Sequence, residues 1–90
     1  MELGYDPGKN AWNIRERGLP FDMVATLNWA RAIVRQDRRT DYGEDRYQAL
    51  ADGPDGRPYV VVFKMRGETM WIISLRRAHE KERRTYGKST

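Results

Sequence analysis

The feature that most constrains the fold of this chain is a nearly unbroken apolar run, Tyr59-Val60-Val61-Val62-Phe63. β-Branched and aromatic residues favour extended backbone, and a continuous apolar run needs cover on both faces of a sheet. We therefore expect a central strand over residues 58–65. Turn-forming sequences at residues 52–56 and 66–68 separate it from strand patterns at residues 45–51 and 69–75. The pattern predicts an antiparallel meander of at least three strands.

The N-terminal third predicts two short helices. Asp6 is a good N-cap, Pro7 suits the first helical turn and Gly18 suits a C-terminus, so we expect a helix over residues 7–17. A second helix is expected from Pro20 to about residue 30 or 32. Its apolar residues recur at roughly helical spacing: Phe21, Val24, Ala25, Leu27, Trp29 and Ala32. Residues 2–5 fit a short edge strand, residues 32–34 fit a brief strand, and residues 76–86 return to helix formers.

The predicted fold class is α+β, with two N-terminal helices packed on an antiparallel meander sheet of three to four strands and a short C-terminal helix. Ninety residues predict a single domain over 1–90. The chain has no cysteine, which excludes disulfides and thiolate metal sites. Its start lacks a signal-peptide pattern, and its apolar stretches are short. We therefore expect neither export nor a membrane span, and a reducing cytoplasm fits.

The basic charge is concentrated towards the C-terminus. Residues 1–56 hold 8 lysines and arginines against 10 acidic residues, whereas residues 57–90 hold 9 against 3, within a net charge of +4. Such a surface attracts RNA, DNA or an acidic protein. A solvated basic helix without any partner is an alternative of about equal weight.

Several side chains fit the cleavage of RNA without a metal, which needs a base, an acid and cations around the phosphate. The arginines suited to phosphate are Arg46, Arg66, Arg76 and Arg77. The groups able to exchange protons are Glu44, Glu82, His79, Tyr86 and Lys9. Arg76 directly follows the last predicted strand, which aims it at one end of the sheet. We therefore expect Arg76→Ala to abolish activity in a folded protein.

Most of these residues also have a structural interpretation. His79, the single histidine, has an ordinary pKa of about 6.5 and suits proton transfer, but an exposed histidine without a role is the commoner case. Glu44 is equally suited to pair with Arg46 or Arg76 and hold its loop on the sheet. Tyr86 fits a contact between helix and core. The tryptophans fit core anchors, while an exposed one suits stacking on a base or on a partner side chain: Trp12, Trp29 and Trp71.

Metal and cofactor chemistry have little support in the sequence. The chain has one histidine, no cysteine and no cluster of carboxylates, and Asp52 and Asp55 flank a turn. Gly53 and Gly56 belong to that same turn and do not form a phosphate-cradling loop. We expect no metal and no cofactor.

An ordered series of motifs spans nearly the whole chain. It comprises Tyr5-Asp6-Pro7-Gly8-Lys9, Asn13, Tyr42-Gly43-Glu44 followed by Arg46, Ile73-Ser74 followed by Arg76 and Ala78, then Glu82 and Tyr86. In this series the chain resembles the BrnT family of bacterial toxin components. The resemblance implies a RelE-like fold and a ribonuclease that arrests translation.

The resemblance also implies partners and site residues. A BrnA-like antitoxin would silence the toxin in an assembly of two toxins with two antitoxins, and operator DNA would be bound only through the antitoxin. RNA is the implied substrate, and the ribosome is a further partner open to test. From the resemblance and the side-chain chemistry together, the expected catalytic residues are Arg76, Glu44, Arg46, Lys9 and Glu82; those expected to bind RNA are Arg17, Arg66, Arg77, His79 and Lys81.

Two positions depart from the family pattern. The family usually has Lys-His-Gly where this chain has Glu16-Arg17-Gly18, and arginine binds phosphate but is no base at neutral pH. Trp71 stands where the family commonly has a basic residue. Activity is then either reduced or redistributed among other residues. The alternative function is a non-catalytic protein that binds nucleic acid or the antitoxin.

Overall fold

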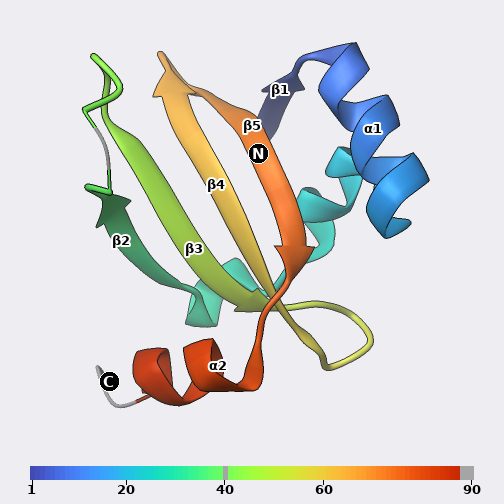
Figure 1. Cartoon of the computed structure of the whole chain (residues 1–90), viewed down its shortest axis with the longest axis vertical. Helices are drawn as coiled ribbons and strands as arrows, with labels where there is room; N and C mark the ends of the chain where they lie inside the picture. The colour runs from blue at the N-terminus through green and yellow to red at the C-terminus, as the bar shows by residue number, and fades with distance from the viewer. Residues whose placement is uncertain (40, 88–90) are drawn as a thin grey trace.

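A mixed β-sheet organises the fold (Figure 1). The structure is a computed structural model that describes residues 1–39 and 41–87. Within that part of the chain, five strands form one sheet in the order β1-β5-β4-β3-β2. β1 runs parallel to β5, whereas the other neighbours are antiparallel. The strands are β1 (Glu2–Tyr5), β2 (Ile33–Asp37), β3 (Arg46–Asp52), β4 (Pro58–Arg66) and β5 (Thr69–Arg77).

The predicted fold class is wrong in the sheet and in the second helix. The meander β3-β4-β5 forms as expected, but β1 adds a parallel edge and β2 adds an antiparallel one. β1 is held in this place by Tyr5, whose ring packs edge-on against Phe21 and whose hydroxyl donates to Asp22. The sheet is therefore mixed and wider than a meander of three to four strands.

Residues 20–32 form two short 3₁₀-helices, η1 (Phe21–Thr26) and η2 (Trp29–Arg31), in place of the second α-helix. The reason lies in the spacing of the apolar residues. Phe21, Val24 and Leu27 recur every third residue, which is the repeat of a 3₁₀-helix, and all three are buried. The N–H of Leu27 donates to the carbonyl of Val24, three residues earlier. A 3.6-residue period would rotate this stripe away from the sheet.

The first helix forms as predicted. α1 (Pro7–Arg17) begins after Asp6, whose carboxylate accepts hydrogen bonds from the N–H groups of Gly8 and Lys9. It ends at Gly18, whose φ of 69° is the left-handed conformation that glycine adopts easily. α2 (Glu80–Gly87) begins later than expected, because β5 stays paired with β4 as far as Arg77.

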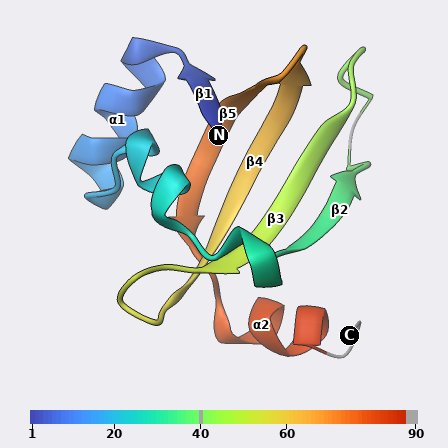
Figure 2. The same cartoon turned by 180° about the vertical axis from the view of Figure 1, so that it is seen from behind.

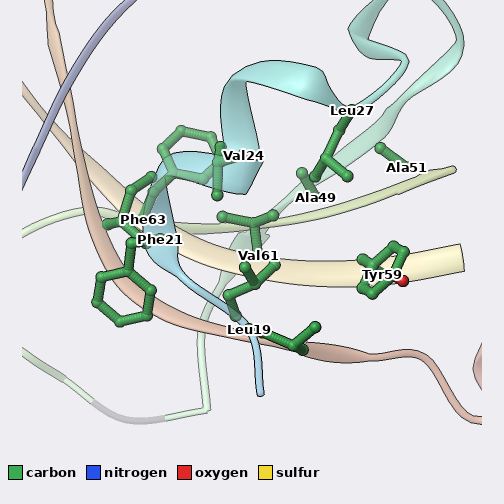
Figure 3. Close-up of a cluster of buried hydrophobic side chains, with 11 residues drawn as sticks. Leu19, Phe21, Val24, Leu27, Ala49, Ala51, Tyr59, Val61 and Phe63 are labelled. Atoms are coloured by element: carbon green, nitrogen blue, oxygen red, sulfur yellow. The ribbon is translucent and has the colours of Figure 1, made fainter. Parts of the chain in front are cut away.

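η1 and η2 cover one face of the sheet (Figure 2). Figure 3 shows the resulting core, in which Phe21, Val24 and Leu27 pack on Val61 and Phe63 of β4. The alternate residues of β4 are buried too, Val60 at 1% and Val62 at 9% exposure. The prediction of a central strand covered on both faces is therefore confirmed for residues 59–63.

At one end of the opposite face of the sheet lies α2 (Figure 1), and Ala78, which precedes that helix, packs there against Leu50 and Val60. Strand pairing aligns Arg35, Gln48, Val62 and Ser74 in one row across this face. A neighbouring row holds Lys64 beside Trp71. We call this surface the open face; its side chains are Arg35, Arg46, Gln48, Val62, Lys64, Arg66, Trp71 and Ser74.

Candidate functional site

A hollow of about 270 Å³ lies between α1 and β5. It exists because β1 accompanies β5 only as far as the pair Tyr5–Ile72, so that α1 borders the rest of that strand. Figure 1 shows α1 beside this edge of the sheet. The hollow is lined by Lys9, Trp12, Asn13, Arg17, Phe21, Ile73 and Ser74.

Arg17 is held in this hollow by neutral groups. Its Nη1 lies 3.2 Å from Asn13 Oδ1, from Ser74 Oγ and from the carbonyl oxygen of Leu75. Asn13 is itself 1% exposed and donates a 2.7 Å hydrogen bond to the carbonyl of Leu19. Within the described part of the chain, Nε and Nη2 of Arg17 make no hydrogen bond. The guanidinium is thus oriented while two of its nitrogens remain available.

The charged side chains that line the hollow are both positive. Among the described residues, Lys9 and Arg17 form no ion pair, and those that line the hollow include no carboxylate. The guanidinium carbon of Arg17 also lies 5.1 Å from the ring centre of Trp12, a cation–π contact. Two uncompensated cations in one concavity attract an anion. The structure therefore brings together two of the predicted site residues, Lys9 and Arg17.

Glu44 and Arg46 lie at a second place, on and beside the open face. Glu44 accepts hydrogen bonds of 2.9 and 3.0 Å from Lys64 and lies 3.5 Å from Arg46. The Lys64 ammonium, followed by Arg46, lowers the pKa of this carboxyl. The guanidinium of Arg46 also stacks 4.0 Å from the ring centre of Tyr42. The structural interpretation of Glu44 is confirmed for its pairing with Arg46.

Although Trp71 is not basic, a cation lies close to it on the open face. Arg66 reaches across from β4 and places its guanidinium carbon 3.8 Å from the ring centre of Trp71. The indole also needs Gly4 of β1, because a Cβ at that residue would lie 2.7 Å from Trp71 Cε3. A cation from the neighbouring strand thus lies over Trp71, at the position where the sequence resemblance led us to expect a basic residue.

Arg76 and Glu82 lie at a third place, where β5 meets α2. Arg76 donates two hydrogen bonds, of 2.6 and 2.7 Å, to the carboxylate of Glu82. Glu82 also accepts the N–H of His79, which caps the start of α2. The Arg76 guanidinium is the main cause that lowers the pKa of Glu82 from 4.5 to about 2. The pair anchors α2 on the sheet and leaves Glu82 a weak base at neutral pH.

The remaining predicted RNA-binding residues, Arg77, His79 and Lys81, are exposed around the start of α2. The side chain of Tyr86 lies outside the described part of the chain. Sequence reasoning did not single out Ser74 and Asn13 as partners of Arg17, or Lys64 as a partner of Glu44. Strand alternation provides a signal for Lys64, since it follows Val60 and Val62 on the same face.

Among the described residues, no helix is long and apolar enough to cross a membrane. That part of the chain also contains no group of three or more His, Cys, Asp or Glu side chains suited to a metal ion.

Fold and site define a small basic α+β protein with an anion-attracting hollow beside a sheet face rich in cations, a class suited to RNA. Residues 5–82 match the family described as the ribonuclease toxin BrnT of type II toxin-antitoxin systems. The chain therefore belongs to the BrnT family, and the interpretation drawn from its motifs is confirmed.

A solved structure supports the fold. The crystal structure of the Brucella abortus ribonuclease toxin BrnT is similar, with a TM-score of 0.61 and 23% sequence identity over 89% of this chain and 99% of that one. No curated protein matches the chain.

Proposed function

We propose that this chain cleaves RNA without a metal ion, at the hollow between α1 and β5. Family membership makes it a ribonuclease toxin of a type II toxin-antitoxin system. The observation that supports this location is the pair Lys9 and Arg17. Both cations lack an ion-pair partner among the described residues, and they share a concavity whose described lining holds no carboxylate.

The proposed reaction is attack of the RNA 2′-oxygen on the adjacent phosphorus with departure of the 5′-oxygen. The 2′-hydroxyl loses its proton to a solvent water, the bond between phosphorus and the 5′-oxygen breaks, and the 5′-oxygen gains a proton, which leaves a 2′,3′-cyclic phosphate and a 5′-hydroxyl. Nε and Nη2 of Arg17 bind the non-bridging oxygens, where negative charge grows. Lys9, the second cation, donates the proton to the leaving oxygen. Arg46 and Arg66 bind the backbone along the open face.

The pairing of the two predicted catalytic carboxylates, Glu44 and Glu82, and of the buried Asp37 supports metal independence. Magnesium in nucleases is held by carboxylate oxygens. Here Glu44 is engaged by Lys64 and Arg46, Glu82 by Arg76, and Asp37 by Arg39 at 2.8 Å. Each of these carboxylates already has a cation.

The partner we propose is a BrnA-like antitoxin, in an assembly of two toxins with two antitoxins that binds operator DNA through the antitoxin. The type II class of the family supports a protein antitoxin. We also propose a cytoplasmic location, where RNA is available as substrate, with translating ribosomes as a further partner.

The test is cleavage of a single-stranded RNA by the purified chain in EDTA, with and without the antitoxin. We expect products with 2′,3′-cyclic phosphate ends, unchanged by EDTA and suppressed by the antitoxin. Loss of cleavage in EDTA that magnesium restores would contradict the metal-free reaction. Salt-dependent binding with no scission would favour the alternative, a protein in which Arg17 binds RNA without cleaving it.

A further inference from the structure

Trp12 is a large aromatic side chain without a packing role that matches its size. It is 45% exposed on α1, where it forms one wall of the hollow. The other two tryptophans have intramolecular partners. Trp29 donates a hydrogen bond to the carbonyl of Val24 and packs edge-on against Phe63, and Trp71 forms a cation–π contact with Arg66. An exposed indole beside two cations is complementary to a ligand that has both a flat ring and a negative charge.

The surroundings of Trp12 hold it ready for such a ligand. Arg17 lies over the ring, and Arg17 is itself fixed by Asn13, Ser74 and the backbone of Leu75. A site whose parts are already fixed loses little conformational entropy on binding. Proteins that bind single-stranded nucleic acid combine aromatic rings, on which bases stack, with cations that follow the phosphates.

We infer that Trp12 is the stacking platform for one unpaired RNA base, whose phosphate is bound by Arg17 and Lys9. The inference rests on the proposed function and adds a substrate class to it, RNA that is single-stranded at the cleavage site. A base inside a duplex has both faces covered by its neighbours and offers Trp12 no surface. The subsite thereby selects loops, unpaired stretches and ends.

A protein side chain from the antitoxin is the competing occupant of Trp12. The chemistry of the hollow favours the nucleotide. Its polar groups are the cations of Lys9 and Arg17 together with the side chains of Asn13 and Ser74, and its described lining holds no acid. A nucleotide supplies the ring and the anion in one unit at the spacing of base and phosphate.

The chain offers a matched control in Ile14. It lies on the same helix, is also 45% exposed, and does not line the hollow. The experiment measures affinity for a short single-stranded oligoribonucleotide, with one base intact or replaced by an abasic unit. The proteins are the unmodified chain, Trp12→Ala, Trp12→Phe and Ile14→Ala, each checked for folding by circular dichroism.

We expect Trp12→Ala to weaken binding of the intact oligonucleotide by about 5- to 150-fold, the range that one base–aromatic stack supplies. Trp12→Phe retains most of the affinity, and Ile14→Ala changes it little. The unmodified chain binds the abasic oligonucleotide more weakly than the intact one. Trp12→Ala binds the two oligonucleotides equally well. This coupling shows that the ring and the base act on each other.

The outcomes separate the subsite from the reaction. Coupled loss of affinity in a chain that cuts no RNA supports the stacking site and removes the proposed cleavage. If Trp12→Ala changes neither the cleavage rate nor the affinity for RNA, the stacking site is contradicted, whereas the proposed ribonuclease activity stands. Unchanged RNA binding combined with weaker inhibition by the antitoxin also overturns it, because Trp12 then belongs to the antitoxin interface.

Discussion

Two arginine side chains, Arg76 on β5 and Arg17 on α1, are held in place by different kinds of partner. At the β5–α2 junction, Arg76 donates two short hydrogen bonds to Glu82. Next to α1, Arg17 is oriented by an amide, a hydroxyl and a carbonyl. Both guanidinium groups are fixed in place. Only the charge of Arg76 is matched by a carboxylate in direct contact.

The difference teaches which arginine is suited to a substrate phosphate. A phosphate competing for Arg76 must displace Glu82, whose ionised form that arginine already stabilises. A phosphate approaching Arg17 displaces no acid, and the neutral partners remain in place behind the guanidinium. We therefore propose that Arg17 binds the scissile phosphate, whereas Arg76 attaches α2 to the sheet through Glu82.

The largest expected effect comes from Arg17→Ala. It removes a fixed donor to the charge that develops on the phosphate, so we expect the cleavage rate constant to fall by about 100- to 1000-fold. Arg17→Lys keeps the charge but loses the planar fork, so we expect its rate constant to lie between those of the unmodified chain and Arg17→Ala. The measurement is the single-turnover rate on a single-stranded RNA.

The matched control for this variant is Arg15→Ala. Arg15 lies on the same helix and is exposed, but it pairs with Glu16 at 3.6 Å. Its rate should stay close to that of the unmodified chain. If the cleavage rate constant fell equally in Arg17→Ala and Arg15→Ala, α1 would contribute only general positive charge. The proposed difference between Arg17 and Arg76 would then be contradicted.

The next effect is on stability, through Arg76→Ala and Glu82→Gln. The side chains of this pair are 29% and 24% exposed, and a hydrogen-bonded charge in such a place contributes about 1.5–3 kcal/mol. We expect each variant to lower the free energy of unfolding by about that amount. Urea denaturation measures it.

The same variants decide the catalytic prediction for Arg76. At a temperature where they remain folded, our assignment expects RNA cleavage close to that of the unmodified chain, whereas the sequence-based prediction expects loss of activity. Arg84→Ala is the stability control, because its pair with Glu80 is exposed and of a kind that supplies about 0.3–0.5 kcal/mol. Loss of cleavage in folded Arg76→Ala would place Arg76 in the reaction and remove the division of labour.

The pH dependence of stability sharpens the role of Glu82. Its pKa is about 2 in the folded chain against an ordinary 4.5, so the unfolded chain binds more protons between these values. The stabilisation is therefore complete above pH 4.5 and is lost as pH falls towards 2. We expect the difference in unfolding free energy between the unmodified chain and Glu82→Gln to shrink over that range. A difference that stays constant down to about pH 2.5 would contradict the ion pair.

Asp37 is the control for this titration. Its pKa is also about 2, lowered mainly by Arg39, so the acid sensitivity of the chain has at least two sources. Glu82→Gln should remove only its own share, and the remaining pH dependence should persist. Asp37→Asn should remove the other share.

The parts of the fold that the sequence predicted are those encoded by neighbouring residues. Asp6 and Gly18 mark the two ends of α1 locally, and short turns connect β3, β4 and β5. The parallel pairing of β1 joins Glu2 to Thr69, which no local pattern encodes. The 3₁₀ segments were missed because repeats of 3.0 and 3.6 residues differ little over so short a stretch.

The candidate residues were predictable in type, but their pairing was predictable only where the partners are close in sequence, as Glu44 and Arg46 are. The sequence identified Arg17, Arg76 and Glu82 as chemically capable. The partner of Arg17 at Ser74 lies 57 positions away, and the choice of Arg76 for Glu82 depends on where β5 ends and α2 begins. Which arginine keeps its charge available is therefore decided by tertiary contacts.

The smallest expected effect comes from Arg66→Ala on the open face. Arg66 rests on Trp71 at 3.8 Å, outside the hollow, so it should contact a flanking phosphate and leave the reaction itself unchanged. We expect a several-fold loss of affinity for single-stranded RNA and a salt dependence shallower by about 0.7 in log–log slope, the share of one phosphate contact. The cleavage rate at saturating RNA should not change. Loss of that rate would extend the reactive site across β5 onto the open face, and the contrast between Arg17 and Arg76 would then describe only part of the site.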